Sequence, residues 1–138
     1  MYILFDGNRD KPEIEISDSP LGLIELGEIF ASITEDFISY SKKIKSEFYP
    51  ENLEAISIKV SPIKNAEKLD LIKIYLREHK LVFEGSQSAL YKLGMSLLNY
   101  FNEHSQKGEH FHLNYVEGDP LLAPTNCYII FLCTDKAS

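Results

Sequence analysis

The chain carries one local pattern twice, and this repetition constrains its fold more than any other feature. Each copy has a short apolar run, then a serine, then a segment whose apolar residues recur every three or four positions. The copies lie 67 positions apart, so that Ile14–Ile16 falls on Leu81–Phe83. The same shift superposes five further pairs: Ser19 on Ser86, Leu23 on Leu90, Leu26 on Leu93, Gly27 on Gly94 and Phe30 on Leu97.

Two explanations fit this match, an internal repeat and the convergent patterning of two amphipathic helices. The paired glycines, Gly27 and Gly94, favour the repeat, because a glycine inside a helix costs about 1 kcal/mol relative to alanine. We expect each glycine to let its helix approach the sheet closely. On this interpretation residues 1–138 form a single domain, with the repeat covering about 2–60 and 69–133.

The first helix has a clear start and an open end. Ser19 suits the N-cap and Pro20 the first helical position. The apolar spacing continues beyond residues 34–36 through Tyr40, Ile44 and Phe48, so the helix is either continuous or breaks near 34–36. In either case we expect it to end by Pro50, since proline does not continue a helix.

The second helix is predicted from about Ser86 to His104, with Gly108 as a terminator beyond its end. Arg77–His79 is short enough to close a hairpin between the two strands that precede this helix. Strand candidates surround both helices, at 2–5, 13–16, 55–60, 69–76, 80–84, 109–113 and 127–133.

These elements predict an α+β fold, a two-layer sandwich in which two helices cover one face of a mostly antiparallel sheet. Seven candidate strands are expected in that sheet, and the two halves form a pseudo-twofold repeat of a β(β)αβ unit. Exposed sheet edges would allow a homodimer, and charges on the edges would favour a monomer, so both states stay open.

The net charge and the hydropathy pattern limit the kinds of partner and the cellular location that are expected for this chain. The formal net charge is −7, which disfavours direct nucleic-acid binding and suits a basic protein partner. The basic run Lys42–Lys45 is expected to be a solvated helix face. No membrane span and no export signal are evident, which predicts a soluble cytoplasmic protein with Cys127 and Cys133 as reduced core thiols.

The segment Gly108–Leu113 is the main candidate for chemistry. In a strand, His110 and His112 share one face, where two imidazoles would suit a zinc site if Cys127 or Cys133 supplied a thiolate. The alternative is that both histidines are solvated or hydrogen-bonded on a polar sheet face, or recognise a partner there.

A long loop, 114–126, follows this strand and is a second candidate for binding. Glu109, Glu117 and Asp119 would form a negative patch if they cluster. The sequence has few features typical of enzymes. It contains no glycine-rich phosphate loop and no nucleophile elbow, and His79 and His104 are isolated. We therefore expect no catalysis, no resident metal and no cofactor.

The second half of the chain carries an ordered series of motifs that extends beyond the histidine strand. Its ordered series is Leu81–Phe83, Gly85–Ser86, a helix with Leu90, Leu93 and Gly94, Gly108–Leu113 and a last apolar strand. This series resembles a family of bacterial immunity proteins of polymorphic toxin systems, small α+β proteins with a glycine–x–histidine–x–histidine–leucine strand. The similarity covers about residues 80–133, and in the first half Ser57 and Lys59 would take the places of the histidines.

The resemblance implies a non-catalytic antitoxin that binds and neutralises a cognate toxin through an acidic surface. Glu109, His110, His112, Glu117 and Asp119 are the partner-binding residues that this implies. The alternative function is a regulatory module that binds a metal or ligand through His110 and His112. Loss of bound metal on replacing both histidines would distinguish the two.

Overall fold

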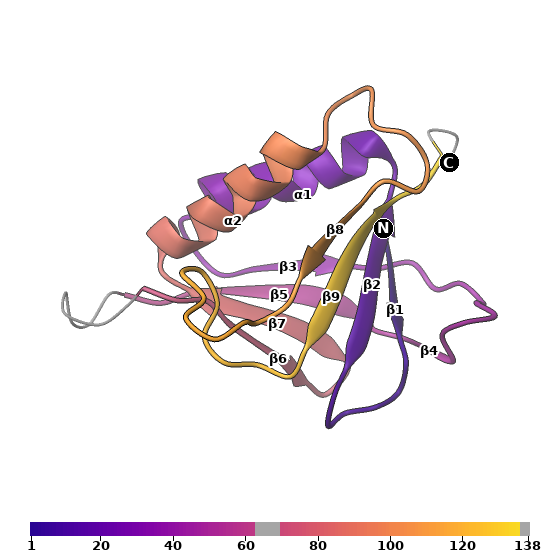
Figure 1. Cartoon of the computed structure of the whole chain (residues 1–138), viewed down its shortest axis with the longest axis horizontal. Helices are drawn as coiled ribbons and strands as arrows, with labels where there is room; N and C mark the ends of the chain where they lie inside the picture. Colours follow the sequence, from indigo (N-terminus) through magenta and orange to yellow (C-terminus); the bar gives the residue numbers. More distant parts are fainter. Residues whose placement is uncertain (63–69, 136–138) are drawn as a thin grey trace.

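The computed structural model describes residues 1–62 and 70–135, which form an α+β fold of two helices and two sheets. The helices cross the top of the molecule, sheet B lies beneath them and sheet A closes one side (Figure 1). The predicted α+β class is confirmed, and five of the seven strand pairings are antiparallel. In place of seven strands in one sheet, however, the described residues form nine strands in two sheets.

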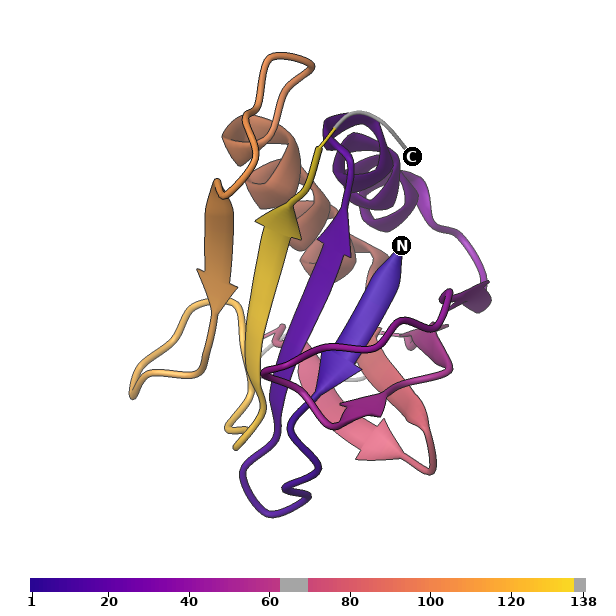
Figure 2. The ribbon, with the colours of Figure 1, turned by 90° about the vertical axis from the view of Figure 1, so that its right-hand side faces the viewer.

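Sheet A has the strand order β4-β1-β2-β9-β8, and Figure 2 shows β8, β9, β2 and β1 side by side. Its strands are β1 (Tyr2–Phe5), β2 (Glu13–Asp18), β4 (Glu51–Asn52), β8 (His110–Leu113) and β9 (Tyr128–Cys133).

Sheet B has the order β3-β5-β7-β6. Its strands are β3 (Phe37–Tyr40), β5 (Ala55–Val60), β6 (Lys73–Arg77) and β7 (Lys80–Gly85). The predicted hairpin is confirmed, since Arg77 pairs with Lys80 and Glu78 has a φ of 57° in the turn between them. The predicted strand 69–76 begins four residues later than expected, and its residue 69 lies outside the described residues.

Helix α1 (Pro20–Ser32) is capped by Ser19, whose hydroxyl oxygen accepts a hydrogen bond from Gly22 N at 3.2 Å. The helix breaks rather than continuing to Phe48, and Ile33 already has extended backbone angles. The chain then enters β3, and Asp36 Oδ1 accepts a hydrogen bond from Val60 N at 2.9 Å. Pairing with β5 therefore replaces the helical turns that the apolar spacing predicts.

The segment after β3 is irregular, which corrects the expected helix face at Lys42–Lys45. Lys42 N donates to Met1 O at 2.9 Å, so this segment runs beside β1. Tyr40, Ile44 and Phe48 are all exposed, and their helical spacing does not mark a buried stripe.

Helix α2 (Gln87–Tyr100) is capped by Ser86, which accepts a hydrogen bond from Ala89 N at 3.0 Å. It ends at Tyr100 with Phe101 as C-cap, four residues before the predicted end. Gly108 has a φ of +94° and lies in the turn before β8, so it does not terminate the helix.

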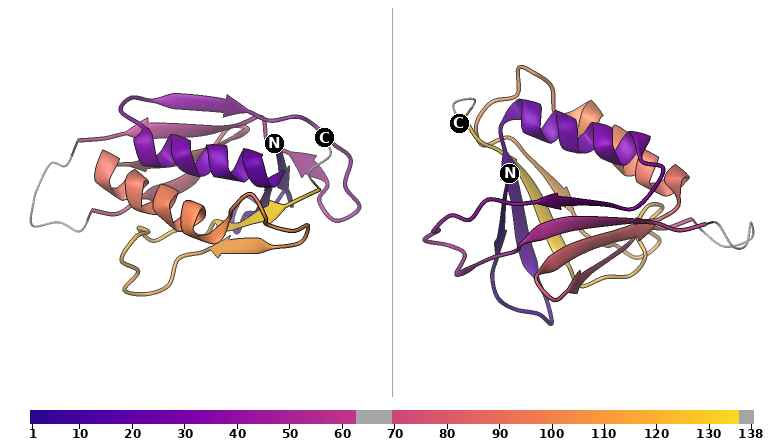
Figure 3. Two further views of the ribbon diagram at one scale, coloured as in Figure 1. Left: turned by 90° about the horizontal axis from the view of Figure 1, so that it is seen from above. Right: turned by 180° about the vertical axis from the view of Figure 1, so that it is seen from behind.

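The two helices lie side by side (Figure 3), and their paired glycines are at the contact between them. A Cβ atom added to Gly94 would lie 2.4 Å from Ala31 N and 2.6 Å from Gly27 O. At Gly27 it would lie 3.1 Å from Leu98 Cδ2 and 3.3 Å from Gly94 O. The glycines therefore permit a close helix–helix contact, and the expected helix–sheet approach was wrong.

A single hydrophobic core joins both helices to both sheets. Phe30 of α1 meets Phe83 of β7 with ring centroids 5.1 Å apart, in an edge-to-face arrangement that stabilises aromatic pairs. Ile16 of β2 and Phe131 of β9 are also fully buried. The inner faces of the two sheets thus share one core with the helices.

The two halves of the chain exchange strands. In the first half, β1 and β2 lie in sheet A, whereas β3 and β5 lie in sheet B. In the second half, β6 and β7 lie in sheet B, whereas β8 and β9 lie in sheet A. Two parallel pairings join the halves, β2 with β9 and β7 with β5. Apart from β4, which pairs with β1 and has no counterpart in sheet B among the described strands, the pairing scheme is the same in both halves. A duplication of the sequence stays a prediction.

Candidate functional site

The two predicted histidines lie together on the outer face of sheet A. They alternate with Phe111, which leans toward the core, and both are exposed on β8, an edge strand. Their rings are 4.7 Å apart, centroid to centroid, in an edge-to-face arrangement. His110 Nδ1 is hydrogen-bonded to Gly108 O at 3.0 Å, and His112 Nδ1 is hydrogen-bonded to the hydroxyl of Tyr128.

The two cysteines lie on the other side of the sheet. Cys133 is buried in the core, and so is Cys127, just before β9. Burial raises the pKa of the Cys127 thiol, against a smaller lowering by its contact with Thr125, so the protonated form is favoured. Within residues 1–62 and 70–135 no three His, Cys, Asp or Glu side chains form a metal-binding group. The two histidines are therefore brought together, but neither cysteine joins them as a third zinc ligand.

The predicted acidic residues lie at two ends of β8 and do not form one patch. Glu109 precedes the strand, whereas Glu117 and Asp119 follow it in the loop 114–126. A strand of four residues spans roughly 13 Å. Glu109 and Glu117 are exposed, and Asp119 is partly buried.

Asp119 organises its own loop. Its carboxylate accepts hydrogen bonds from Leu121 N and Leu122 N at 2.9 Å each, and from Val116 N at 3.4 Å. Burial raises the pKa of Asp119, but these backbone hydrogen bonds lower it more, and the net shift is downward. This arrangement gives Asp119 a structural role in holding the loop.

The loop 114–126 is attached to sheet B rather than free. Ala123 N donates to Ile72 O at 2.9 Å, and Ile72 N donates to Leu121 O at 2.8 Å. Thr125 Oγ1 donates to Ile74 O at 2.8 Å. The loop therefore links the two sheets, and its conformation is set by the fold.

The site contains residues that the sequence interpretation missed. The register places Glu13 opposite Tyr128, and Glu15 in one row with Ile130 and His112. The alternation of polar and apolar residues over Glu13–Ile16 indicates that Glu13 and Glu15 share a polar face. It does not indicate that β9 is the neighbouring strand. We define the outer face of sheet A as eight residues of β2, β9 and β8: Glu13, Glu15, Ser17, Tyr128, Ile130, Leu132, His110 and His112.

Negative charge is concentrated at one side of this face. Partial burial raises the pKa of Glu15, and the charge of Glu13 raises it further. Tyr49 lies nearby, and burial together with Glu13, Glu15 and Asp6 raises its pKa to about 12. The eight residues that define the face include no lysine or arginine, but Ser17 is buried and lines a hollow with Lys42 and Lys45, which border the face at that end. The face therefore presents carboxylates at β2 and imidazoles at β8, with the partly exposed apolar residues of β9 between them.

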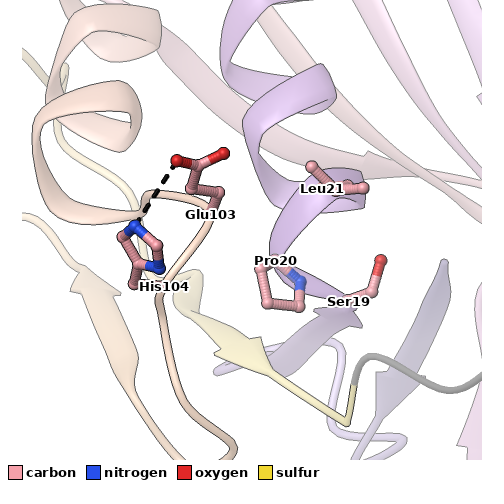
Figure 4. Close-up of a pocket in the computed structure, with 5 residues that line it drawn as sticks. All are labelled: Ser19, Pro20, Leu21, Glu103 and His104. Atoms are coloured by element: carbon pink, nitrogen blue, oxygen red, sulfur yellow. Dashed lines mark ion pairs between the residues drawn. The ribbon is translucent and has the colours of Figure 1, made fainter.

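A separate pocket lies between the start of α1 and the turn after α2 (Figure 4). It has a volume of about 360 Å³ and is lined by Ser19, Pro20, Leu21, Glu103 and His104. Glu103 and His104 form an exposed ion pair at 3.4 Å. The Ser19 hydroxyl points away from the His104 ring and caps α1, so these residues are not arranged as a nucleophile and its base.

The pairing scheme also corrects the comparison of the two halves. Ser57 and Lys59 lie on β5, the counterpart of β9, and not on the counterpart of β8. The position that matches His112 is Ile38, which pairs with Ser57 as His112 pairs with Ile130. The first half therefore has an apolar residue where the second has an imidazole.

The fold and the outer face of sheet A define a small α+β domain with a solvent-facing polar surface. Comparisons with protein-family models, with curated proteins and with solved structures find no match to this chain. Neither helix of the described residues is long and apolar enough to cross a membrane.

Proposed function

We propose that this chain is a non-catalytic immunity protein that binds and neutralises a cognate toxin. The outer face of sheet A is the proposed binding surface. The observation that carries the proposal is the composition of this face: Glu13 and Glu15 on one side, His110 and His112 on the other, and apolar residues of β9 between them. Apolar residues with a polar surround are the usual arrangement of a protein interface.

The charge of this face supports a basic partner. Two carboxylates lie on β2 without a lysine or arginine among the eight residues of the face, and the whole chain carries −7. Complementary charge accelerates association and selects among partners. Enzymes that act on nucleic acids carry basic surfaces, so a toxin of that class is the proposed partner.

The rigidity of the face also supports binding. Strand β9 pairs along its length with β2, and its other side pairs with β8. Side chains held by a paired strand lose little further freedom on binding, which lowers the entropic cost of association. The residues of this face are therefore suited to act without rearrangement.

The resemblance of residues 80–133 to immunity proteins supports a toxin as partner. In this proposal the protein acts in the cytoplasm and protects the cell that makes the toxin. It does so by occupying the toxin's surface and not by chemistry.

The test is co-expression with the toxin domain encoded beside this gene, with growth and complex formation as readouts. The key variant is Glu13→Lys/Glu15→Lys, which reverses the charge of the face. The matched control is Glu25→Lys/Glu28→Lys, which makes the same charge change on the exposed side of α1. Thermal unfolding of each variant shows whether it is folded.

We expect growth to be rescued by the natural chain and by the control, and to be lost with the sheet A variant. The complex should weaken at higher salt, since exposed charges are screened. Continued killing in the presence of the folded natural chain, without a complex, would reject the proposal. Equal loss of rescue in both variants would assign the effect to net charge and reject this face.

A further inference from the structure

Two imidazoles on the exposed side of β8 lie close enough to bind one ion. His110 and His112 are two residues apart on the strand, so their side chains leave it on the same face, and both are exposed. Their ring centroids are 4.7 Å apart. Strand β8 is the outermost strand of sheet A on this side (Figure 2), so solvent reaches both rings.

The hydrogen bonds of the two rings use Nδ1 and leave Nε2 for a ligand. His110 Nδ1 is 3.0 Å from Gly108 O, and a carbonyl oxygen only accepts, so Nδ1 carries the proton and Nε2 of the neutral ring has the free lone pair. His112 Nδ1 is hydrogen-bonded to the hydroxyl of Tyr128, whose oxygen can accept from Nδ1 in the same way. Metal-binding histidines usually donate their second ring nitrogen to such an acceptor, which fixes the ring and its tautomer.

The separation of the rings fits one ion held by both Nε2 atoms. With metal–nitrogen bonds of about 2.0–2.1 Å, an ion in line with each ring lies roughly 3.2 Å from each centroid. For centroids 4.7 Å apart, the two directions then meet at the ion at about 95°. Neighbouring ligands of square-planar and octahedral ions are about 90° apart, and those of a tetrahedral ion about 109°. The spacing therefore suits Cu²⁺ or Ni²⁺ better than Zn²⁺.

The surroundings favour a cation and leave its other positions open. Glu13 and Glu15 lie on the same face of sheet A, two strands away at roughly 10 Å, and the whole chain carries −7. Lys107, which precedes β8, is paired with Asp135 at 3.5 Å. In the part of the chain that the structure describes, no third His, Cys, Asp or Glu joins the two imidazoles. Water or a small ligand would therefore complete the coordination.

We propose that His110 and His112 form an open, two-imidazole site for a divalent transition-metal ion, with Cu²⁺ or Ni²⁺ preferred over Zn²⁺. Nε2 of each ring is the ligand, and the Tyr128 hydroxyl is a positioning group for His112. The site differs from the zinc site considered from the sequence, because no thiolate takes part and the ion lies at the surface. It does not depend on the proposed function, and the isolated chain is sufficient for its tests.

The first test is isothermal titration calorimetry of the untagged chain with CuCl₂, NiCl₂ and ZnCl₂ in a weakly coordinating buffer. We expect one ion per chain, with affinity falling from Cu²⁺ to Ni²⁺ to Zn²⁺. His110→Gln and His112→Gln should each weaken Cu²⁺ binding about tenfold or more, because a single imidazole loses the advantage of two linked ligands. The matched control is His79→Gln/His104→Gln, which removes two exposed imidazoles outside β8 and should bind as the natural chain does.

Circular dichroism and thermal unfolding establish that each variant is folded. Unchanged Cu²⁺ affinity in a folded His110→Gln/His112→Gln variant would overturn the proposal. So would an equal loss in the His79→Gln/His104→Gln control, which would assign the ion to other histidines. Tighter binding of Zn²⁺ than of Ni²⁺ would reject the geometry deduced from the ring separation.

The second test counts the ligands and examines Tyr128. Pulsed electron paramagnetic resonance of the Cu²⁺-loaded chain should detect two coordinated imidazoles in the natural chain and one in each single variant; fewer than two in the natural chain would overturn the proposal. Tyr128→Phe should keep both imidazoles but weaken binding roughly tenfold. Its matched control is Tyr75→Phe, which removes a hydroxyl bonded to Glu84 on sheet B. Equal affinities of these two variants would reject the positioning role of Tyr128.

Discussion

Alanine at position 94 is expected to separate the two helices and to destabilise the fold. The added Cβ would lie 2.4 Å from Ala31 N and 2.6 Å from Gly27 O, both backbone atoms of α1. A side chain at this distance cannot turn aside, because it is the Cβ itself that is too close. Either α1 or α2 has to move, which disturbs the core that both helices cover.

The magnitude follows from two opposing terms. Alanine gains about 1 kcal/mol over glycine in helix propensity. Overpacking a close-packed contact costs about 1–3 kcal/mol, and a clash with backbone belongs at the upper end. For Gly94→Ala the expected net loss of unfolding free energy is therefore about 2 kcal/mol, which lowers Tm by roughly 8 °C for a chain of this size.

Gly27→Ala is the matched comparison on the facing helix. Its Cβ would lie 3.1 Å from the side chain of Leu98 and 3.3 Å from Gly94 O. The leucine can shift by a few tenths of an ångström, so the steric cost and the gain in helix propensity nearly cancel. We expect the unfolding free energy of this variant to lie within about 1 kcal/mol of the natural chain.

Urea and thermal unfolding of both variants, followed by far-ultraviolet circular dichroism, measure these differences. Similar denaturant m-values would show that the compared states bury the same surface. Gly94→Ala with unchanged or higher stability would refute the close helix contact. So would equal losses for the two variants, since the asymmetry follows directly from backbone contact at one position and side-chain contact at the other.

Three further predictions test the caps, the loop and the acidic face. Ser86→Ala should cost about 1–2 kcal/mol in urea unfolding and more than Ser19→Ala, because only the Ser86 cap is buried. The Asp119→Asn variant should be less stable than the natural chain at neutral pH. Because the folded pKa of Asp119 is lowered, this difference should shrink as the pH falls below the ordinary value of 3.8 and through the folded pKa; a difference independent of pH would exclude the carboxylate as its source. Comparison of the natural chain with Tyr49→Phe by absorbance titration should assign a phenol ionising near pH 12 to Tyr49, and Glu13→Gln should move that midpoint down; a midpoint near 10 would contradict the burial of Tyr49.

The local elements were predictable from sequence where neighbouring residues decide them. Ser19 and Ser86 mark the helix starts because an N-cap depends on residues within one turn. Strand β5 was predicted with its observed bounds from its apolar run alone. Short-range chemistry was sufficient at these positions.

Pairing between distant segments was not predictable in the same way. The break after α1 depends on β5, since Val60 N binds Asp36 and β3 pairs along β5. Spacing alone could not distinguish an exposed edge strand from further turns of helix, because Tyr40 keeps the helical interval. The division into two sheets has the same cause: alternation identifies a strand but not its neighbour.

For the candidate site, the sequence identified the shared face of His110 and His112 but not what lies beside it. Glu15 is distant in sequence and reaches this face only through the pairing of β2 with β9. Partner binding by Asp119 stays a prediction; what the sequence did not indicate is that its carboxylate accepts hydrogen bonds from backbone amides of its own loop. A polar residue in a turn does not reveal from sequence which of these tasks it has.

The exchange of strands between the two halves has a consequence for folding during synthesis. Strand β2 emerges from the ribosome early, but its neighbour β9 is made after all the other described strands. Until β9 arrives, the nascent chain presents β2 as an open edge, and pairing it requires closing a loop of more than a hundred residues. The central pairing of sheet A, between β2 and β9, therefore joins residues that are far apart in sequence, and sheet A forms late in folding. A nascent-chain profile should show proteolytic protection of β2 only after residue 133 has left the exit tunnel.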